Sequence, residues 1–189
     1  MTARDRPAED SARKQELLQA AYSYVTDHGL VEMSLRPLAE AVGSSPRVLL
    51  FLFGSKDGLV QALLARARED ELALLRQADV DAGGGIPAAG LRIWSWLAAP
   101  EHRSLLKLWT EAYARSLLDP TGPWREFARQ TVDDWLAILA AAQPSAARRT
   151  RAGAAERTLA LAVLRGSLLD LLATGDERRV TAAVRAHFG

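Results

Sequence analysis

Residues Ser34–Lys56 read SLRPLAEAVGSSPRVLLFLFGSK, a pattern of two short helices joined by a tight turn. The first helix is expected at Leu35–Val42 and the second at Pro46–Phe53. A serine that can cap a helix precedes each one, and a proline lies in each first turn, where a missing N–H costs little. Gly43 and Gly54 are expected to end the two helices, because glycine readily adopts the backbone conformation that follows a helix.

Both short helices have an apolar inner face. These faces are expected to consist of Leu35, Leu38, Ala39 and Val42 on the first helix and Val48, Leu49 and Phe53 on the second. Ser45, Arg47 and Phe51 then face outward. This arrangement is typical of a helix-turn-helix, whose second helix enters the major groove of DNA. Leu50 and Leu52 make the second helix unusually apolar, so either its affinity for DNA is modest or some of these side chains pack inward.

Helical patterns also fill the rest of the chain. Helices are expected at Ser11–His28, Lys56–Gln77, Leu91–Ala98, 101–118, Trp124–Ala142, Ser145–Ala173 and 177–188. No strand alternation is present, so we expect an all-α fold. The glycine-rich stretch Asp81–Gly90 is expected to be the main internal break, because consecutive glycines lose much entropy in a helix. Residues 1–10 are polar and charged and are expected to be disordered.

The composition limits the classes of function. The chain has 189 residues and no cysteine, which excludes disulfides, thiolate catalysis and cysteine-based zinc sites. Its 24 Lys/Arg and 23 Asp/Glu residues give a net charge of +1, so contact with phosphates must come from individually placed cations. No signal peptide and no apolar run of about 18 residues is visible, and we expect a cytoplasmic protein that does not insert into a membrane.

The run Ser34–Lys56 resembles the DNA-binding signature of the TetR family of transcriptional regulators. The run LLDLLATGD at Leu168–Asp176 also resembles the end of a TetR-type ligand domain. The resemblance implies a disordered tail at 1–10, followed by an N-terminal three-helix helix-turn-helix domain at 11–56. A helical ligand-binding and dimerisation domain would follow at 57–189.

The resemblance also implies roles for individual residues. Contacts with DNA are expected from Ser34, Arg36, Ser45, Pro46, Arg47, Phe51 and Lys56. Ser34 would cap its helix and touch a phosphate, and Lys56 would reach another phosphate at a helix N-terminus. Arg47 is the candidate for a base contact, because arginine pairs bidentately with guanine. Leu50 and Leu52 stand where the family commonly has tyrosine and histidine, so the polar contacts rest on few residues.

All five tryptophans lie between Trp94 and Trp135. An aromatic cluster with few polar groups is typical of a small-molecule site, and the resemblance places an effector site in these helices. The expected ligand-binding residues are Trp94, Trp109, Tyr113, Trp124, Phe127 and Trp135. Glu111, Gln130 or Arg103 would supply a polar contact. The alternative is that these aromatic side chains are packed core.

The last two helices carry the expected dimer interface. Its residues are Leu159, Val163, Gly166, Ser167, Asp170, Leu171, Val180, Val184 and Phe188. Small residues at Gly166 and Ser167 permit close approach of helices, and a two-fold dimer would present two recognition helices to successive major grooves. The alternative is a core helix within a monomer.

The sequence therefore predicts a ligand-responsive, DNA-binding transcriptional regulator. It would be a homodimeric repressor, released from double-stranded operator DNA by a small, largely apolar effector. No enzyme motif is present, the three histidines are scattered, and no metal or cofactor site is expected. The alternative is a helical protein that binds a small molecule or a partner and whose DNA binding is weakened or lost.

Overall fold

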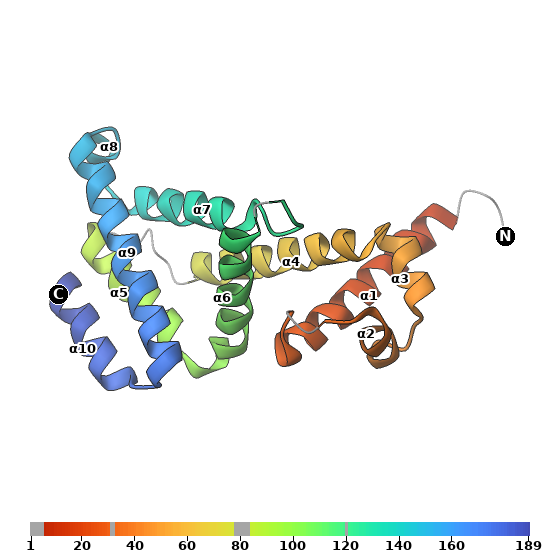
Figure 1. Ribbon diagram of the computed structural model, residues 1–189. Helices are drawn as coiled ribbons and strands as arrows, with labels where there is room; N and C mark the ends of the chain where they lie inside the picture. Colours follow the sequence, from red (N-terminus) through yellow and green to blue (C-terminus); the bar gives the residue numbers. More distant parts are fainter. Residues whose placement is uncertain (1–5, 31–32, 78–83, 120) are drawn as a thin grey trace. The chain divides into compact units, whose positions relative to one another are not determined.

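The computed structural model of the chain describes residues 6–30, 33–77, 84–119 and 121–189. Within these ranges all regular elements are helices, which confirms the all-α class (Figure 1). The chain forms two compact units. The first unit is Met1–Glu69 with Lys107–Ala128, and the second unit is Asp70–Leu106 with Arg129–Gly189.

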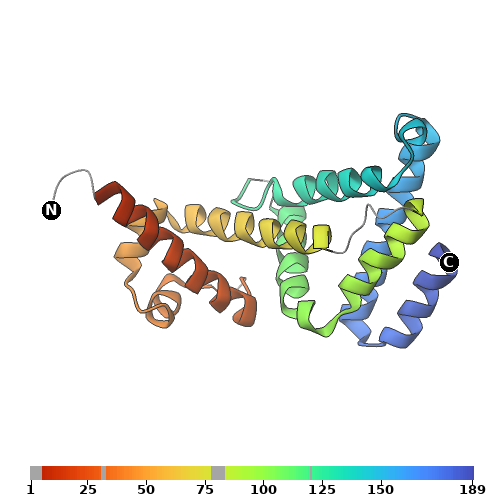
Figure 2. The same cartoon turned by 180° about the vertical axis from the view of Figure 1, so that it is seen from behind.

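The first unit begins with three helices that pack on one another, α1 (Arg6–His28), α2 (Leu35–Ala41) and α3 (Pro46–Phe53). They lie side by side in both views (Figures 1 and 2). The start of α4 (Lys56–Gln77) and most of α6 (Arg103–Leu118) complete this unit. Its core consists of apolar side chains from these helices: Leu17, Ala21, Val25, Leu38, Ala39, Leu49, Phe53, Leu59 and Leu63.

The second unit is built on α5 (Gly85–Ala98), α9 (Arg151–Thr174) and α10 (Glu177–Phe188), which pack against one another (Figure 2). It also contains the 3-10 helix η1 (Pro100–His102), most of α7 (Phe127–Ala142) and the single turn α8 (Ser145–Arg148). The core of the three main helices is apolar and includes Ile93, Leu97, Leu164, Leu168, Leu171, Val180, Val184 and Phe188.

Several helix boundaries differ from those expected. Helix α1 begins at Arg6, not near Ser11, so residues 6–10 of the expected tail are helical, and residues 1–5 lie outside the described residues. Helix α7 begins at Phe127, not at Trp124. The expected long helix from Ser145 is two helices, because Thr150 starts a new one by accepting a hydrogen bond from the N–H of Gly153 at 2.9 Å.

The glycine-rich break is shorter than expected, because α5 already begins at Gly85. Pro87 fits this start, since proline is tolerated in the first turn of a helix. Gly90 then lies inside α5, where the ring of Phe188 on α10 packs directly on it. A Cβ atom at Gly90 would lie 2.6 Å from that ring. The entropy that glycine loses in a helix is therefore offset here by a close contact of α5 with α10.

Within the described ranges no single helix is long and apolar enough to cross a membrane. The pair formed by α3 and Lys56–Ala73 meets that criterion by length and composition only, and it is bent by 70°.

Candidate nucleic-acid interface

Helices α2 and α3 are joined by a tight turn. Gly43 adopts a left-handed conformation with φ of 63°, and the next N–H, of Ser44, donates to the carbonyl of Ala39 at 2.8 Å. Ser45 begins α3 by accepting a hydrogen bond from the N–H of Val48 at 3.3 Å, as its sequence position predicts. These local bonds turn the chain between α2 and α3, so the helix-turn-helix is formed by residues 35–53.

The end of α3 leads directly into α4. Gly54 has φ of 79°, which a side-chain-bearing residue rarely adopts. Ser55 then accepts a hydrogen bond from the N–H of Gly58 at 3.0 Å and caps α4. Lys56 is thereby held at the N-terminus of α4 with its side chain exposed. A cation at the N-terminus of a helix suits contact with a phosphate, because the helix N-terminus itself favours anions.

Helix α3 divides into a buried and an exposed face. Leu49 and Phe53, four residues apart, are buried against the neighbouring helices, and the ammonium of Lys14 lies 5.3 Å from the centre of the Phe53 ring. The expected inward packing of Val48 is wrong, since 39% of it is exposed. At about 100° per residue, Val48 lies about 100° around α3 from Leu49 and about 140° from Phe53, so it lies away from the middle of the buried face.

Leu50 and Leu52, whose packing could not be predicted from the sequence, differ in burial. Leu50 is 38% exposed, and Leu52 is half-buried. Phe51 is 76% exposed and lies on the same side of α3 as Arg47, four residues earlier. The outer face of α3 is therefore formed by one arginine and three apolar side chains, those of Val48, Leu50 and Phe51.

The residues predicted to contact DNA lie on the surface of the first unit. Ser34, Arg36, Ser45, Arg47, Phe51 and Lys56 are exposed, and Pro46 is half-buried. Ser34 occupies the position before α2, but its side chain makes no capping hydrogen bond, so the expected cap is wrong.

Charges around this surface are sparse. The sequence of α3, PRVLLFLF, contains Arg47 as its one charged residue, and no carboxylate lies on this helix. Exposed cations flank it at Arg36 on α2 and Lys56 on α4, and exposed carboxylates occur at Glu40 and Asp57. Asp57 lies in the first turn of α4, where the helix dipole stabilises a negative charge. The centre of the surface is thus positive or apolar, and its acidic groups lie on the neighbouring helices.

Helix α6 contacts the end of α1 through Glu111. One carboxylate oxygen, Oε2, accepts a hydrogen bond from the backbone N–H of Leu30 at 3.0 Å. The other oxygen, Oε1, is buried and has no hydrogen-bond partner among the residues that the structure describes. Glu111 therefore joins α6 to the residues that follow α1, and it retains one oxygen that could bind another donor.

The six residues predicted to bind an effector fall into two groups. Trp109, Tyr113, Trp124 and Phe127 belong to the first unit, whereas Trp94 and Trp135 belong to the second unit. The rings of Trp109 and Tyr113 are stacked with centroids 5.0 Å apart.

The two tryptophans of the second unit are buried and hydrogen-bonded within it. Trp94 donates its Nε1–H to Thr181 Oγ1 at 2.9 Å, and Trp135 donates to the buried carboxylate of Glu71 at 2.8 Å. Trp94 also lines a groove of about 580 Å³ whose walls come from α5 and α10, including Arg185 on α10.

The residues predicted to form a dimer interface also separate into two sets. Leu171, Val180, Val184 and Phe188 are buried in the core of the chain itself, so the expectation that they contact a partner is wrong. Their spacing agreed with an interface because apolar residues that face a core and apolar residues that face a partner recur with the same helical period. Leu159 is 55% exposed, Gly166 is exposed, and Val163, Ser167 and Asp170 are half-buried.

Helix α9 carries an exposed row of apolar residues between Ala155 and Ala173, with exposed Glu156 and Thr158 beside it. Its exposed residues at helical spacing are Ala155, Leu159, Ala162, Gly166, Leu169 and Ala173. No charged side chain interrupts this row. A solvated helix face normally carries charge, so this face of α9 has the character of a surface that is covered by another helix.

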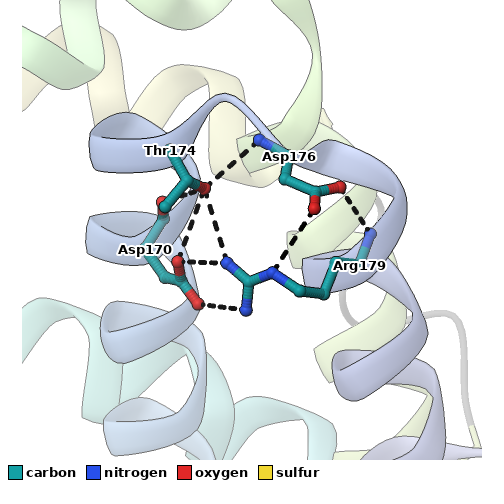
Figure 3. Close-up of polar contacts among 4 residues, drawn as sticks. All are labelled: Asp170, Thr174, Asp176 and Arg179. Atoms are coloured by element: carbon teal, nitrogen blue, oxygen red, sulfur yellow. Dashed lines mark hydrogen bonds and ion pairs between the residues drawn. The ribbon is translucent and has the colours of Figure 1, made fainter.

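Asp170 makes its ion pair within the chain. Its carboxylate accepts two hydrogen bonds from the guanidinium of Arg179 on α10, at 2.6 and 2.9 Å (Figure 3). The Arg179 side chain also lies 3.4 Å from Asp176, which caps α10 (Figure 3). The hydrogen bonds from Arg179 lower the pKa of Asp170 below its ordinary value. Asp170 therefore fixes α10 to the end of α9.

The fold resembles several solved structures. A transcriptional regulator from Rhodococcus sp. Rha1 matches with 21% identity and a TM-score of 0.76, covering 93% of this chain and 94% of that one. A TetR transcription regulator from Haloarcula marismortui matches with 16% identity and a TM-score of 0.71, covering 94% and 96%. The multidrug binding protein EbrR, solved in complex with imidazole, matches with 24% identity and a TM-score of 0.64, covering 94% and 89%.

No protein-family model matches the sequence, and a comparison with curated proteins finds no match. The structural likeness extends over nearly the whole chain and establishes the fold. It is that of TetR-family transcriptional regulators, an N-terminal helix-turn-helix followed by a helical domain.

Proposed function

We propose that this chain is a TetR-family transcriptional regulator that binds operator DNA through α2 and α3. The observation that carries the proposal is the exposed helix α3 on a capped helix-turn-helix, in a chain whose whole fold is that of such regulators. An α-helix with its side chains is about 10–12 Å in diameter, which fits a major groove about 12 Å wide. Arg47 would contact a base, and Lys56 a phosphate.

Binding to labelled duplexes tests this proposal. Sequences are first selected from a random duplex library with the purified chain, and affinity is then measured by fluorescence anisotropy over a range of salt concentrations. Lys56→Ala should weaken binding to all sequences alike and reduce the salt slope by about one. Arg47→Ala should cost about 1–3 kcal/mol of binding free energy and relax the sequence preference at one position.

A matched control is Arg151→Ala, which removes an exposed arginine from the start of α9 in the second unit. It should leave affinity and sequence preference unchanged. Absence of salt-sensitive binding to any duplex, by a chain shown to be folded, would contradict the proposal. That outcome would favour the alternative of a helical binding protein without DNA binding, which the apolar outer face of α3 also suits.

We propose further that the regulator is a homodimer and that the exposed apolar face of α9 forms its interface. A dimer would let two α3 helices reach half-sites about 34 Å apart, one helical turn of DNA. Leu159→Arg should give a monomer in sedimentation velocity. Leu117→Arg, at an exposed leucine of α6, should leave the dimer intact. A wild-type chain that stays monomeric at micromolar concentration would contradict the proposal.

The proposed effector is a small, largely apolar molecule that releases the repressor from its operator in the cytoplasm. In the first unit, Trp109, Tyr113, Trp124 and Phe127 would contact it, and the unpaired oxygen of Glu111 would supply a polar contact. Trp94 and Trp135 remain candidates that are tested separately. Compounds are screened for quenching of tryptophan fluorescence that accompanies loss of DNA binding. An effector that still quenches and still releases DNA in both Trp109→Phe and Trp135→Phe would contradict this assignment.

A further inference from the structure

Arg47 alone supplies hydrogen-bonding groups for reading bases on the outer face of α3. Apart from Arg47, its exposed side chains are those of Val48, Leu50 and Phe51. Spacings of three and four residues place Arg47 beside Leu50 and Phe51, and Val48 beside Phe51, so these four side chains form one continuous outer face. An exposed aromatic ring next to two exposed aliphatic chains is unusual for a surface that contacts only water.

The major groove presents one apolar group to a protein. Guanine, cytosine and adenine expose donors and acceptors there, whereas thymine also exposes its C5 methyl group. An apolar side chain can therefore distinguish thymine from the other bases without any hydrogen bond. Valine, leucine and phenylalanine cannot donate or accept a hydrogen bond, so a methyl group is the feature of the groove that they can recognise.

Charge favours DNA as the occupant of this face. Helix α3 itself carries Arg47 and no carboxylate, whereas the neighbouring helices carry both signs of charge, with Arg36 and Glu40 exposed on α2 and Lys56 and Asp57 exposed on α4. The positive charge of α3, with no carboxylate on this helix, is complementary to the two phosphate backbones that border a major groove.

We propose that α3 reads its operator through thymine methyl groups, with Phe51, Val48 and Leu50 packed on them and Arg47 on a neighbouring guanine. This inference rests on the proposed DNA binding and adds to it the class of base that is recognised. The affinity for the operator then depends on C5 methyl groups. A 5-methylcytosine, which presents a methyl group at the same edge of the base, should partly replace a thymine at these positions.

Replacement of thymine by uracil tests the inference, because it removes the methyl group and leaves the base pairing intact. The best duplex from a random library is synthesised with dT replaced by dU at one position at a time, and affinity is measured by anisotropy. Each contacted methyl should weaken binding about fourfold when it is removed, the factor expected for one buried methyl group. Positions without a contact should show no change.

Variants then connect the methyl groups to α3. In Phe51→Ala, dT and dU duplexes should bind equally at the position that Phe51 contacts, and this loss of discrimination should appear as coupling in a double-mutant cycle. Phe51→Leu should keep part of the discrimination, because it remains apolar. Leu117→Ala, at an exposed leucine of α6, should retain all of it. Phe51 is mostly exposed, so its substitution leaves the core of the first unit intact.

The possible outcomes separate this inference from the proposed function. Salt-sensitive, sequence-specific binding that is unchanged by dU at every position would overturn the methyl readout and leave DNA binding established. Absence of binding to every duplex would overturn both. Self-association that is lost in Phe51→Ala and blocked by no duplex would identify a second copy of the chain as the occupant of this face, and would also overturn the inference.

Discussion

Two substitutions on α3, Leu49→Ala and Phe51→Ala, should have very different effects on stability. Leu49 is fully buried, so Leu49→Ala removes three carbon groups that each contribute about 0.8 kcal/mol through burial, together about 2.4 kcal/mol. The cavity that remains raises the expected loss to about 3 kcal/mol or more. Phe51 is mostly exposed, and its replacement by alanine should change the free energy of unfolding by less than about 0.5 kcal/mol.

Urea denaturation followed by far-UV circular dichroism measures the overall change in stability. Because the chain has two compact units, hydrogen exchange of the α2 and α3 amides is measured as well, and it reports the opening of this region itself. Leu49→Ala should accelerate exchange in both helices, and Phe51→Ala should not. Equal effects of the two substitutions, or a larger effect at Phe51, would show that α3 does not pack through Leu49, and the assignment of its outer face would then fail.

Two further predictions concern the second unit. Gly90→Ala should lower the stability of the second unit by about 1–3 kcal/mol, because the new methyl group would meet the buried ring of Phe188. Thermal or urea denaturation measures this change. Unchanged stability would mean that the ring shifts freely. Asp170→Asn should lower the Tm near neutral pH, because Arg179 lowers the pKa of this carboxyl in the folded chain below its ordinary 3.8. The stabilisation is present above that value and is lost as the pH falls through the lower folded-state pKa, so variant and wild type should converge in strong acid. A difference in Tm between variant and wild type that persists in strong acid would contradict the ion pair with Arg179 as the source of the stabilisation.

The helix-turn-helix could be predicted almost entirely from sequence because local interactions form it. The cap by Ser45, the two prolines and the glycines that follow each helix act within a few residues, and α3 has the bounds predicted for it. The cap expected from Ser34 does not form. The boundaries of α5 and α9 were predicted less well. The start of α5 depends on where one of three consecutive glycines enters the helix, and Gly90 is explained by a contact with α10 that is remote in sequence.

The assignments of faces and partners were less predictable. Val48 was expected inside and is exposed, and Val184 was expected at an interface and is buried in the core. Apolar residues at helical spacing show that a face is buried, but the same spacing serves a core and an interface between subunits. The sequence shows Glu111 as a polar residue among aromatic residues. Its hydrogen bond with the N–H of Leu30 joins residues 81 positions apart, so no nearby residue pattern predicts it.

By itself, the sequence determined that this protein is all-α and that Ser34–Lys56 contains two short helices joined by a turn. The contacts of Arg47 and Lys56 with DNA stay a prediction. The tertiary structure decided which apolar side chains are hidden. It buries Leu49 and Phe53 and leaves Phe51 exposed, and it buries one face of α9 while leaving the other face apolar and uncovered. The physical reason is that caps and turns depend on neighbouring residues, whereas burial depends on which distant helices pack against each face.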